Sequence, residues 1–94
     1  MLGTTAYSAG QKALQAAPED AAAWDTAGWL YYQQGAYPVA LSHLKNAVSK
    51  GETAVRRYHL AMAYSKLGDS TEAERNLKTA KRLDPQLKVE GTVQ

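Results

Sequence analysis

The sequence has no cysteine, which excludes disulfide bonds and metal sites built on thiolates. It also has no apolar run near the roughly 20 residues that a membrane-spanning helix needs, so we expect no membrane insertion by this chain. The first five residues, Met1 to Thr5, supply neither the basic segment nor the apolar segment of a signal peptide. Few residues are β-branched, and no stretch alternates for long between apolar and polar residues, which argues against a sheet.

Phenylalanine is absent as well, whereas the 94 residues include six tyrosines and two tryptophans, and alanine is the commonest apolar residue. Small residues beside a few large rings are typical of closely packed helices. A hydrophobic content of 45% is enough for one small domain with a modest core. We therefore expect an all-α fold.

An excess of charge of one sign is also missing, because the formal net charge is only +2. The basic residues form two small groups, near Arg56 and between Lys78 and Lys88, and acidic residues interrupt the second group. Nucleic-acid binding favours a continuous basic stripe, often with stacking aromatic residues. We interpret these groups as solvated helix faces and expect no nucleic-acid partner.

Turn signals divide the chain into segments of about a dozen residues, an ordinary helix length. Gly35 and Gly68 can adopt the left-handed conformation that ends a helix, and Pro38 suits a first helical turn. Asp69 followed by Glu72 is typical of a helix N-terminus. The five helices that we expect are Thr5–Ala17, Ala21–Gln34, Tyr37–Ser49, Ala54–Leu67 and Thr71–Leu83.

The segments also repeat, because residues of the same kind recur about 33 positions apart. The matching pairs are Gly28 and Ala61, Tyr31 and Tyr64, Gly35 and Gly68, Ala40 and Ala73, Leu44 and Leu77, and Ala47 and Ala80. A period in this range indicates stacked helix–turn–helix units. One such unit cannot bury its apolar face alone, so the units must stack on one another.

These residues, together with Trp24 ahead of the first set and Leu83-Asp84-Pro85 after the second, resemble the tetratricopeptide repeat. The resemblance implies antiparallel helix–turn–helix repeats stacked as a short right-handed superhelix. We expect a half repeat at residues 1–18, full units at 19–53 and 54–87, and a tail at 88–94. The half repeat suggests that the chain is part of a longer protein.

The chain departs from the family pattern at several positions. Ala27 stands where the family usually has leucine, and Arg57 occupies the tryptophan position of the second unit. Ser70 replaces an aromatic residue, Glu52 replaces a proline between the units, and Gly10 replaces a large residue. We expect these departures to loosen the packing locally.

The resemblance implies a binding groove lined by the first helix of each unit. Exposed positions at helical spacing lie on one face, and here they hold aromatic, Met and His side chains, which suit a partner segment. The expected partner-binding residues are Asp25, Thr26, Trp29, Tyr32, Gln33, Tyr58, His59, Met62 and Lys66. The alternative is that Trp29 and Tyr58 pack against neighbouring helices.

Some relatives hold the C-terminal carboxylate of heat-shock chaperones with lysine, asparagine and arginine on this face. The matching positions here include Asp25, Thr26 and Trp29, and they do not supply that pattern. Capture of a chaperone tail is therefore disfavoured.

Signatures of catalysis are missing too. The two histidines, His43 and His59, fall on different expected helices, and the sequence has no zinc-protease, phosphate-loop or nucleophile-elbow motif. We expect no enzymatic activity, no cofactor and no metal ion.

Two functions remain. The first is a protein-interaction module, a scaffold or adaptor that binds a protein or peptide segment in the groove. The second is a structural repeat that mediates self-association through the open half repeat. Residues 25–29 and the tyrosines that follow also resemble the last repeats of long bacterial proteins of this family, which implies a scaffold on the cytoplasmic or periplasmic side of a bacterial envelope.

Overall fold

The computed structural model describes residues 14–15 and 17–88, and this part of the chain contains helices and no strand. Four helices follow one another: α2 (Ala21–Gln33), α3 (Tyr37–Lys50), α4 (Ala54–Lys66) and α5 (Ser70–Leu83). The predicted all-α class is therefore confirmed, and these four helices begin and end within one residue of the predicted bounds. The first expected helix, Thr5–Ala17, lies mostly outside the described residues.

Three of the helices begin at a side chain that caps them. Asp20 accepts a hydrogen bond from the Ala22 amide at 2.9 Å, and Thr53 accepts one from the Arg56 amide at 3.1 Å. Asp69 accepts one from the Glu72 amide at 3.1 Å, as its spacing predicted. Each cap satisfies an N–H group that has no partner within the helix.

The first helix of each unit ends in the same way. Gly35 and Gly68 both have φ of +84°, a left-handed conformation that side chains with a Cβ disfavour. In the first turn, the Ala36 amide donates to the Tyr31 carbonyl oxygen at 3.0 Å, and in the second the Asp69 amide donates to that of Tyr64 at 3.0 Å. This pairing reverses the chain tightly, so that α3 and α5 fold back against α2 and α4.

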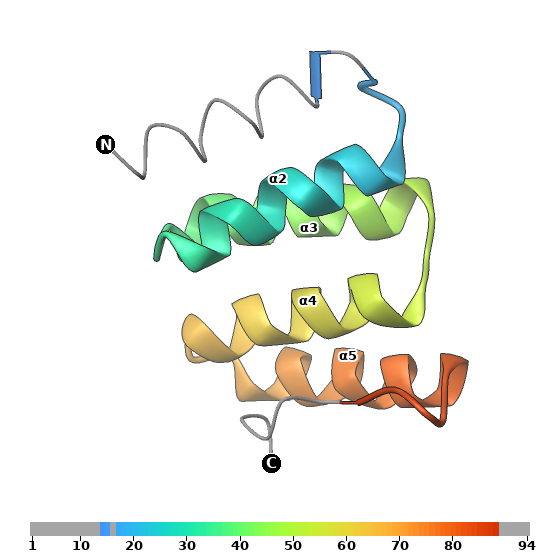
Figure 1. Ribbon diagram of the computed structural model, residues 1–94. Coiled ribbons are helices and arrows are strands. Elements are labelled where there is room, and N and C mark those ends of the chain that lie inside the picture. The colour runs from blue at the N-terminus through green and yellow to red at the C-terminus, as the bar shows by residue number, and fades with distance from the viewer. Residues whose placement is uncertain (1–13, 16, 89–94) are drawn as a thin grey trace.

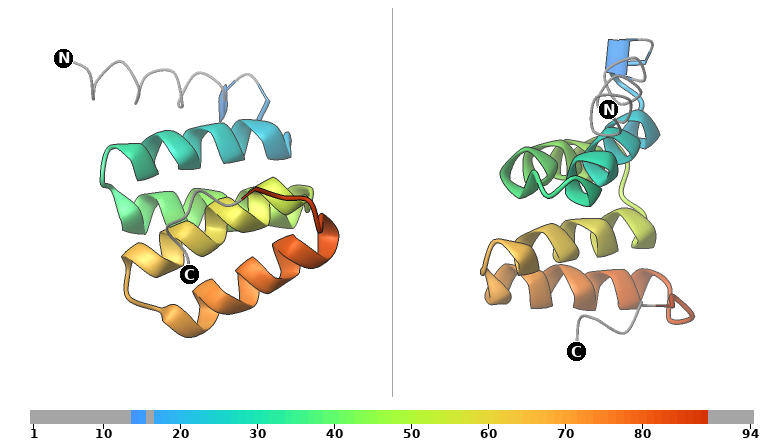
Figure 2. Two further views of the ribbon diagram at one scale, coloured as in Figure 1. Left: turned by 60° about the horizontal axis from the view of Figure 1, so that its bottom comes forward. Right: turned by 60° about the vertical axis from the view of Figure 1, so that its left-hand side comes forward.

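The result is two helical hairpins stacked on each other. The α2–α3 pair lies above the α4–α5 pair, and the two first helices, α2 and α4, lie on the same side of the stack (Figure 1; Figure 2). Helix α4 contacts both α2 and α3. None of the described helices has the length and apolar character needed to cross a membrane. The right-handed superhelix stays a prediction.

Small residues allow the helices to approach closely. A Cβ atom added to Gly28 would lie 2.7 Å from Cγ of Leu44, so the α2–α3 contact requires glycine at this position. Ala40, Ala47 and Leu44 on α3 are each 0% exposed. Three residues of the repeat pattern, Tyr31, Ala40 and Leu44, form a buried cluster with Leu60 and Ala63 of α4.

Candidate functional site

The candidate site is the face formed by the two first helices, α2 and α4, which we call the inner face. The nine predicted residues divide into three groups by exposure. Thr26, Gln33 and Lys66 are exposed, whereas Asp25, Trp29, Tyr32 and His59 are half-buried, and Tyr58 and Met62 are buried.

The expected exposure of Tyr58 and Met62 is wrong, because each side chain is only 8% exposed. Both belong to an apolar cluster with Ala61 of α4 and with residues of α5. The segment after α5 turns back along the α4–α5 pair (Figure 1), and its Leu87 packs on this cluster. The helical spacing correctly placed these two residues on α4, but it carried no information about what covers them.

A stack of aromatic rings connects the two units across the inner face. The ring of Trp29 on α2 lies 3.9 Å from that of His59 on α4, centroid to centroid, with 17° between their planes. Trp29 also stacks on Tyr32 of its own helix at 4.5 Å and 5°. Such pairs contribute about 0.5–1.5 kcal/mol each beyond their burial. The alternative that Trp29 packs against a neighbouring helix therefore holds for part of its surface.

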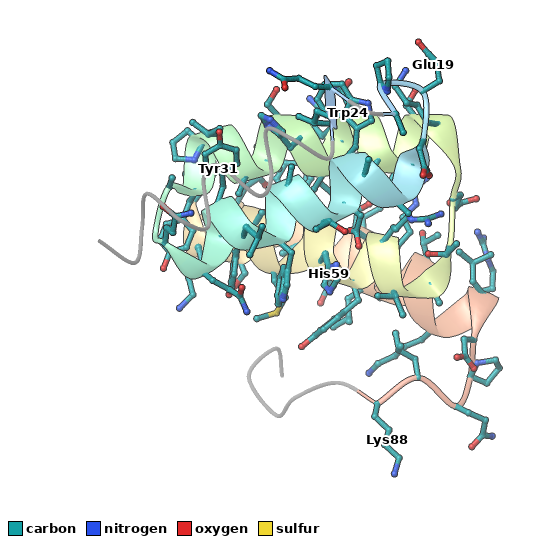
Figure 3. All side chains as sticks on the ribbon, turned by 45° about the horizontal axis from the view of Figure 1, so that its top comes forward. Glu19, Trp24, Tyr31, His59 and Lys88 are labelled. Atoms are coloured by element: carbon teal, nitrogen blue, oxygen red, sulfur yellow. The ribbon has the colours of Figure 1, made fainter. Side chains whose placement is uncertain are left out.

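Asp25 fixes the orientation of the His59 ring. Its Oδ1 atom lies 2.9 Å from Nδ1 of His59, and the two side chains are only 16% and 14% exposed. Because a carboxylate only accepts hydrogen bonds, Nδ1 carries the donated proton. Figure 3 shows His59 on α4 beside α2, where this bond and the ring stack hold it.

At the Tyr32 end of the ring stack, further contacts reach Lys66. The Tyr32 ring meets that of Tyr37 edge-on at 5.4 Å, and Nζ of Lys66 lies 6.0 Å from the centre of the Tyr37 ring. Burial raises the pKa of Tyr32 above its usual value, and the neighbouring Tyr37 and Tyr58 phenols raise it further. At neutral pH the phenol is therefore a neutral hydrogen-bonding group.

Sequence reasoning placed Asp25 and His59 on the same face but missed their pairing. The 33-residue period aligns His59 with Thr26, so Asp25 lies one position from the equivalent residue on the neighbouring unit. Because residues one period apart lie at equivalent places on neighbouring first helices, the period could have identified Asp25 and His59 as neighbours in space.

Positions 33 residues apart also make contacts between the two helices of each unit. In the first unit the Trp24 ring lies 5.2 Å from that of His43, and Trp24 is on the side of α2 away from His59 (Figure 3). In the second unit Arg57 Nη1 donates to Oδ1 of Asn76 at 2.7 Å. At the position equivalent to Trp24, Arg57 therefore makes a hydrogen bond to the second helix of its unit instead of a ring contact.

The described residues contain no group of three His, Asp or Glu side chains that could hold a metal ion. The inner face therefore offers ring edges, a neutral phenol, an oriented imidazole and a lysine, which are groups for contact and hydrogen bonding. Residues 56–87 match the family model described as the tetratricopeptide repeat, which includes most of α4 and all of α5. No curated protein matches the chain.

Proposed function

We propose that this chain, which belongs to the tetratricopeptide-repeat family, is a protein-interaction module that binds a segment of a partner protein on its inner face. Stacked helical repeats commonly present such surfaces to partner proteins. The observation that carries the proposal is the ring stack of His59, Trp29 and Tyr32, which spans both units and remains partly open to solvent.

The composition of the face supports this function. Aromatic side chains supply large contact areas with little loss of conformational entropy, and they are enriched at the energetic centres of interfaces. Here they are already held in place by the Asp25–His59 bond and by mutual stacking, so little ordering remains when a partner binds. Exposed Thr26, Gln33 and Lys66 surround them and provide polar contacts.

The two tryptophans provide a direct test, because they lie on different sides of α2. A Trp24→Phe variant leaves Trp29 as the single tryptophan, and a Trp29→Phe variant leaves Trp24. A peptide selected by display on the immobilised chain is titrated into both variants while tryptophan fluorescence is recorded. We expect a saturable spectral shift with Trp24→Phe and none with Trp29→Phe. A shift confined to Trp29→Phe would place the binding surface elsewhere.

A second set of variants separates binding from folding. Thr26, Gln33 and Lys66 are exposed, so their joint replacement by alanine leaves the core intact. We expect this triple variant to keep the wild-type circular dichroism spectrum and to bind the selected peptide at least about fivefold more weakly, which corresponds to about 1 kcal/mol. Unchanged affinity would contradict the proposal.

Self-association stays an alternative function. It depends on the half repeat at residues 1–18, most of which lies outside the described residues. Sedimentation at increasing protein concentration distinguishes the two functions, because a peptide-binding module stays monomeric whereas a self-associating repeat grows in mass. The bacterial envelope location also stays a prediction.

A further inference from the structure

A second candidate site lies outside the inner face. A cavity of about 240 Å³ opens between α3 and α5, with Lys45 and Val48 of α3 on one side and Glu72 and Asn76 of α5 on the other. Residues of α4 line it as well, among them Arg57 and Leu60. We call it the outer cavity. The Asp25–His59 pair and the ring stack of the inner face contribute nothing to its lining.

Cationic groups dominate the outer cavity. Arg57 is held by its Nε atom, which lies 2.6 Å from Oε2 of Glu52, and by its Nη1 atom, which donates to the buried Asn76. A guanidinium carries five N–H donors, so further donors remain on Arg57. Lys45 is exposed and forms no ion pair with any residue of the described part of the chain.

The single acidic side chain among the lining residues is already paired. Oε2 of Glu72 lies 3.2 Å from Nη1 of Arg75, one turn along α5. Arg57 is paired with Glu52 and Glu72 with Arg75, so Lys45, unpaired among the described residues, gives the outer cavity its one excess positive charge. Asn76 is 3% exposed and locks the Arg57 guanidinium in a fixed plane, which suits a planar carboxylate.

The volume of the outer cavity and its apolar lining restrict the size and the chemical type of ligand that can bind. Sites for whole small molecules usually span about 300–1,000 Å³, so this cavity accommodates one or two side chains. Val48 and the nearly buried Leu60 supply an apolar surface beside the cations. The Glu72 carboxylate repels a doubly charged phosphate more strongly than a singly charged carboxylate.

We propose that the outer cavity binds a glutamate side chain that stands next to a leucine in a segment of a partner protein. Lys45 and the remaining donors of Arg57 bind the glutamate carboxylate, while Val48 and Leu60 contact the leucine side chain. Within the chain itself, Arg57 Nε already donates to a carboxylate oxygen, Oε2 of Glu52, at 2.6 Å. This site is independent of the inner face, so either surface can bind without the other.

The test uses two probe peptides that differ only in charge, acetyl-Leu-Glu-Leu-amide and acetyl-Leu-Gln-Leu-amide. Each is titrated into the isotope-labelled chain, and the signals of the Arg57 Nε–H group, the Asn76 side-chain amide and the Leu60 methyl groups are followed by NMR. We expect the glutamate peptide to shift all three sets of signals and the glutamine peptide to leave them unchanged. Because surface charges are screened by salt, the shifts should shrink as NaCl rises.

Three variants complete the test. Lys45→Ala should raise the dissociation constant for the glutamate peptide at least about threefold, the scale of one partly exposed ion pair. Lys78→Ala is the matched control, because Lys78 is an exposed lysine of α5 that does not line the cavity, and it should leave the constant unchanged. Glu52→Gln removes the internal carboxylate and should tighten binding at least about twofold.

The proposal is overturned if both peptides shift the signals equally, because the carboxylate would then contribute nothing. It is also overturned if Lys45→Ala and Lys78→Ala weaken binding by the same factor, or if the shifts map to Trp29 and His59 on the inner face. Shifts produced equally by sodium acetate at the same concentration would show a general anion effect and contradict recognition of a glutamate–leucine segment.

Discussion

Replacement of Arg57 by methionine should destabilise the chain through Asn76. Asn76 is 3% exposed, and its Oδ1 atom accepts the hydrogen bond from Arg57 Nη1 at 2.7 Å. Methionine keeps an unbranched apolar stem but removes the donor, so a buried acceptor loses its partner. An unsatisfied buried polar group costs about 1–3 kcal/mol, and loss of the partly exposed ion pair with Glu52 adds at most about 1 kcal/mol. We expect a total loss of about 1–4 kcal/mol.

The measurement is the free energy of unfolding from urea titrations followed by circular dichroism. The double variant Arg57→Met/Asn76→Leu removes both polar partners, and such exchanges are often nearly neutral. It should therefore recover most of the stability lost in Arg57→Met, with a coupling energy of about 1 kcal/mol or more in the double-mutant cycle. The reasoning is refuted if Arg57→Met costs less than about 0.5 kcal/mol, or if the double variant is no more stable than the single one.

Three further predictions concern backbone geometry and pH. Gly28→Ala places a Cβ atom 2.7 Å from Cγ of the fully buried Leu44. The resulting overpacking costs about 1–3 kcal/mol and should outweigh the roughly 1 kcal/mol that alanine gains in helix propensity. A variant as stable as wild type in urea would contradict the close approach. Gly68→Val should lower the free energy of unfolding by about 1–2 kcal/mol, because φ is +84° at this position. Gly68→Asn should lower it clearly less, because asparagine tolerates a positive φ better. Equal thermal melting points for the two variants would oppose this explanation. The raised pKa of Tyr32 means that the folded state holds the phenol proton more tightly than the unfolded chain, so this stabilisation is present below pH 10.0 and is lost as pH rises through the higher folded-state pKa. From about pH 9 to about pH 11, wild type should therefore lose more unfolding free energy than Tyr32→Phe, and parallel losses would argue against the shift.

The helices and the core were determined by the sequence alone, because both depend on local signals repeated in register. Gly35 and Gly68 end the first helices because only a residue without Cβ adopts φ of +84° easily. Gly28 and Leu44 bring α2 and α3 close together because a small residue must face a large one. Each of these features depends on a few neighbouring residues or on the period, so a pattern of residue types predicts it.

The site was predictable only in part. The helical spacing placed Trp29, His59 and Tyr58 on first helices, but it does not specify which of them solvent reaches. Tyr58 is buried in a cluster with Leu77 and Ala80 of α5, on which Leu87 also packs, and the spacing of residues along α4 does not encode these neighbours. The assignment of the site residues to a partner stays a prediction.

Only the tertiary structure decided how chemically different residues meet. The Asp25–His59 bond joins positions 34 residues apart, and the Arg57–Asn76 bond gives Arg57, a departure from the family pattern, a partner on the next helix. Hydrogen bonds and ring stacks depend on distances of a few ångströms between separate helices. A pattern of residue types fixes which face a side chain occupies, whereas the packing of one helix against the next fixes its partner.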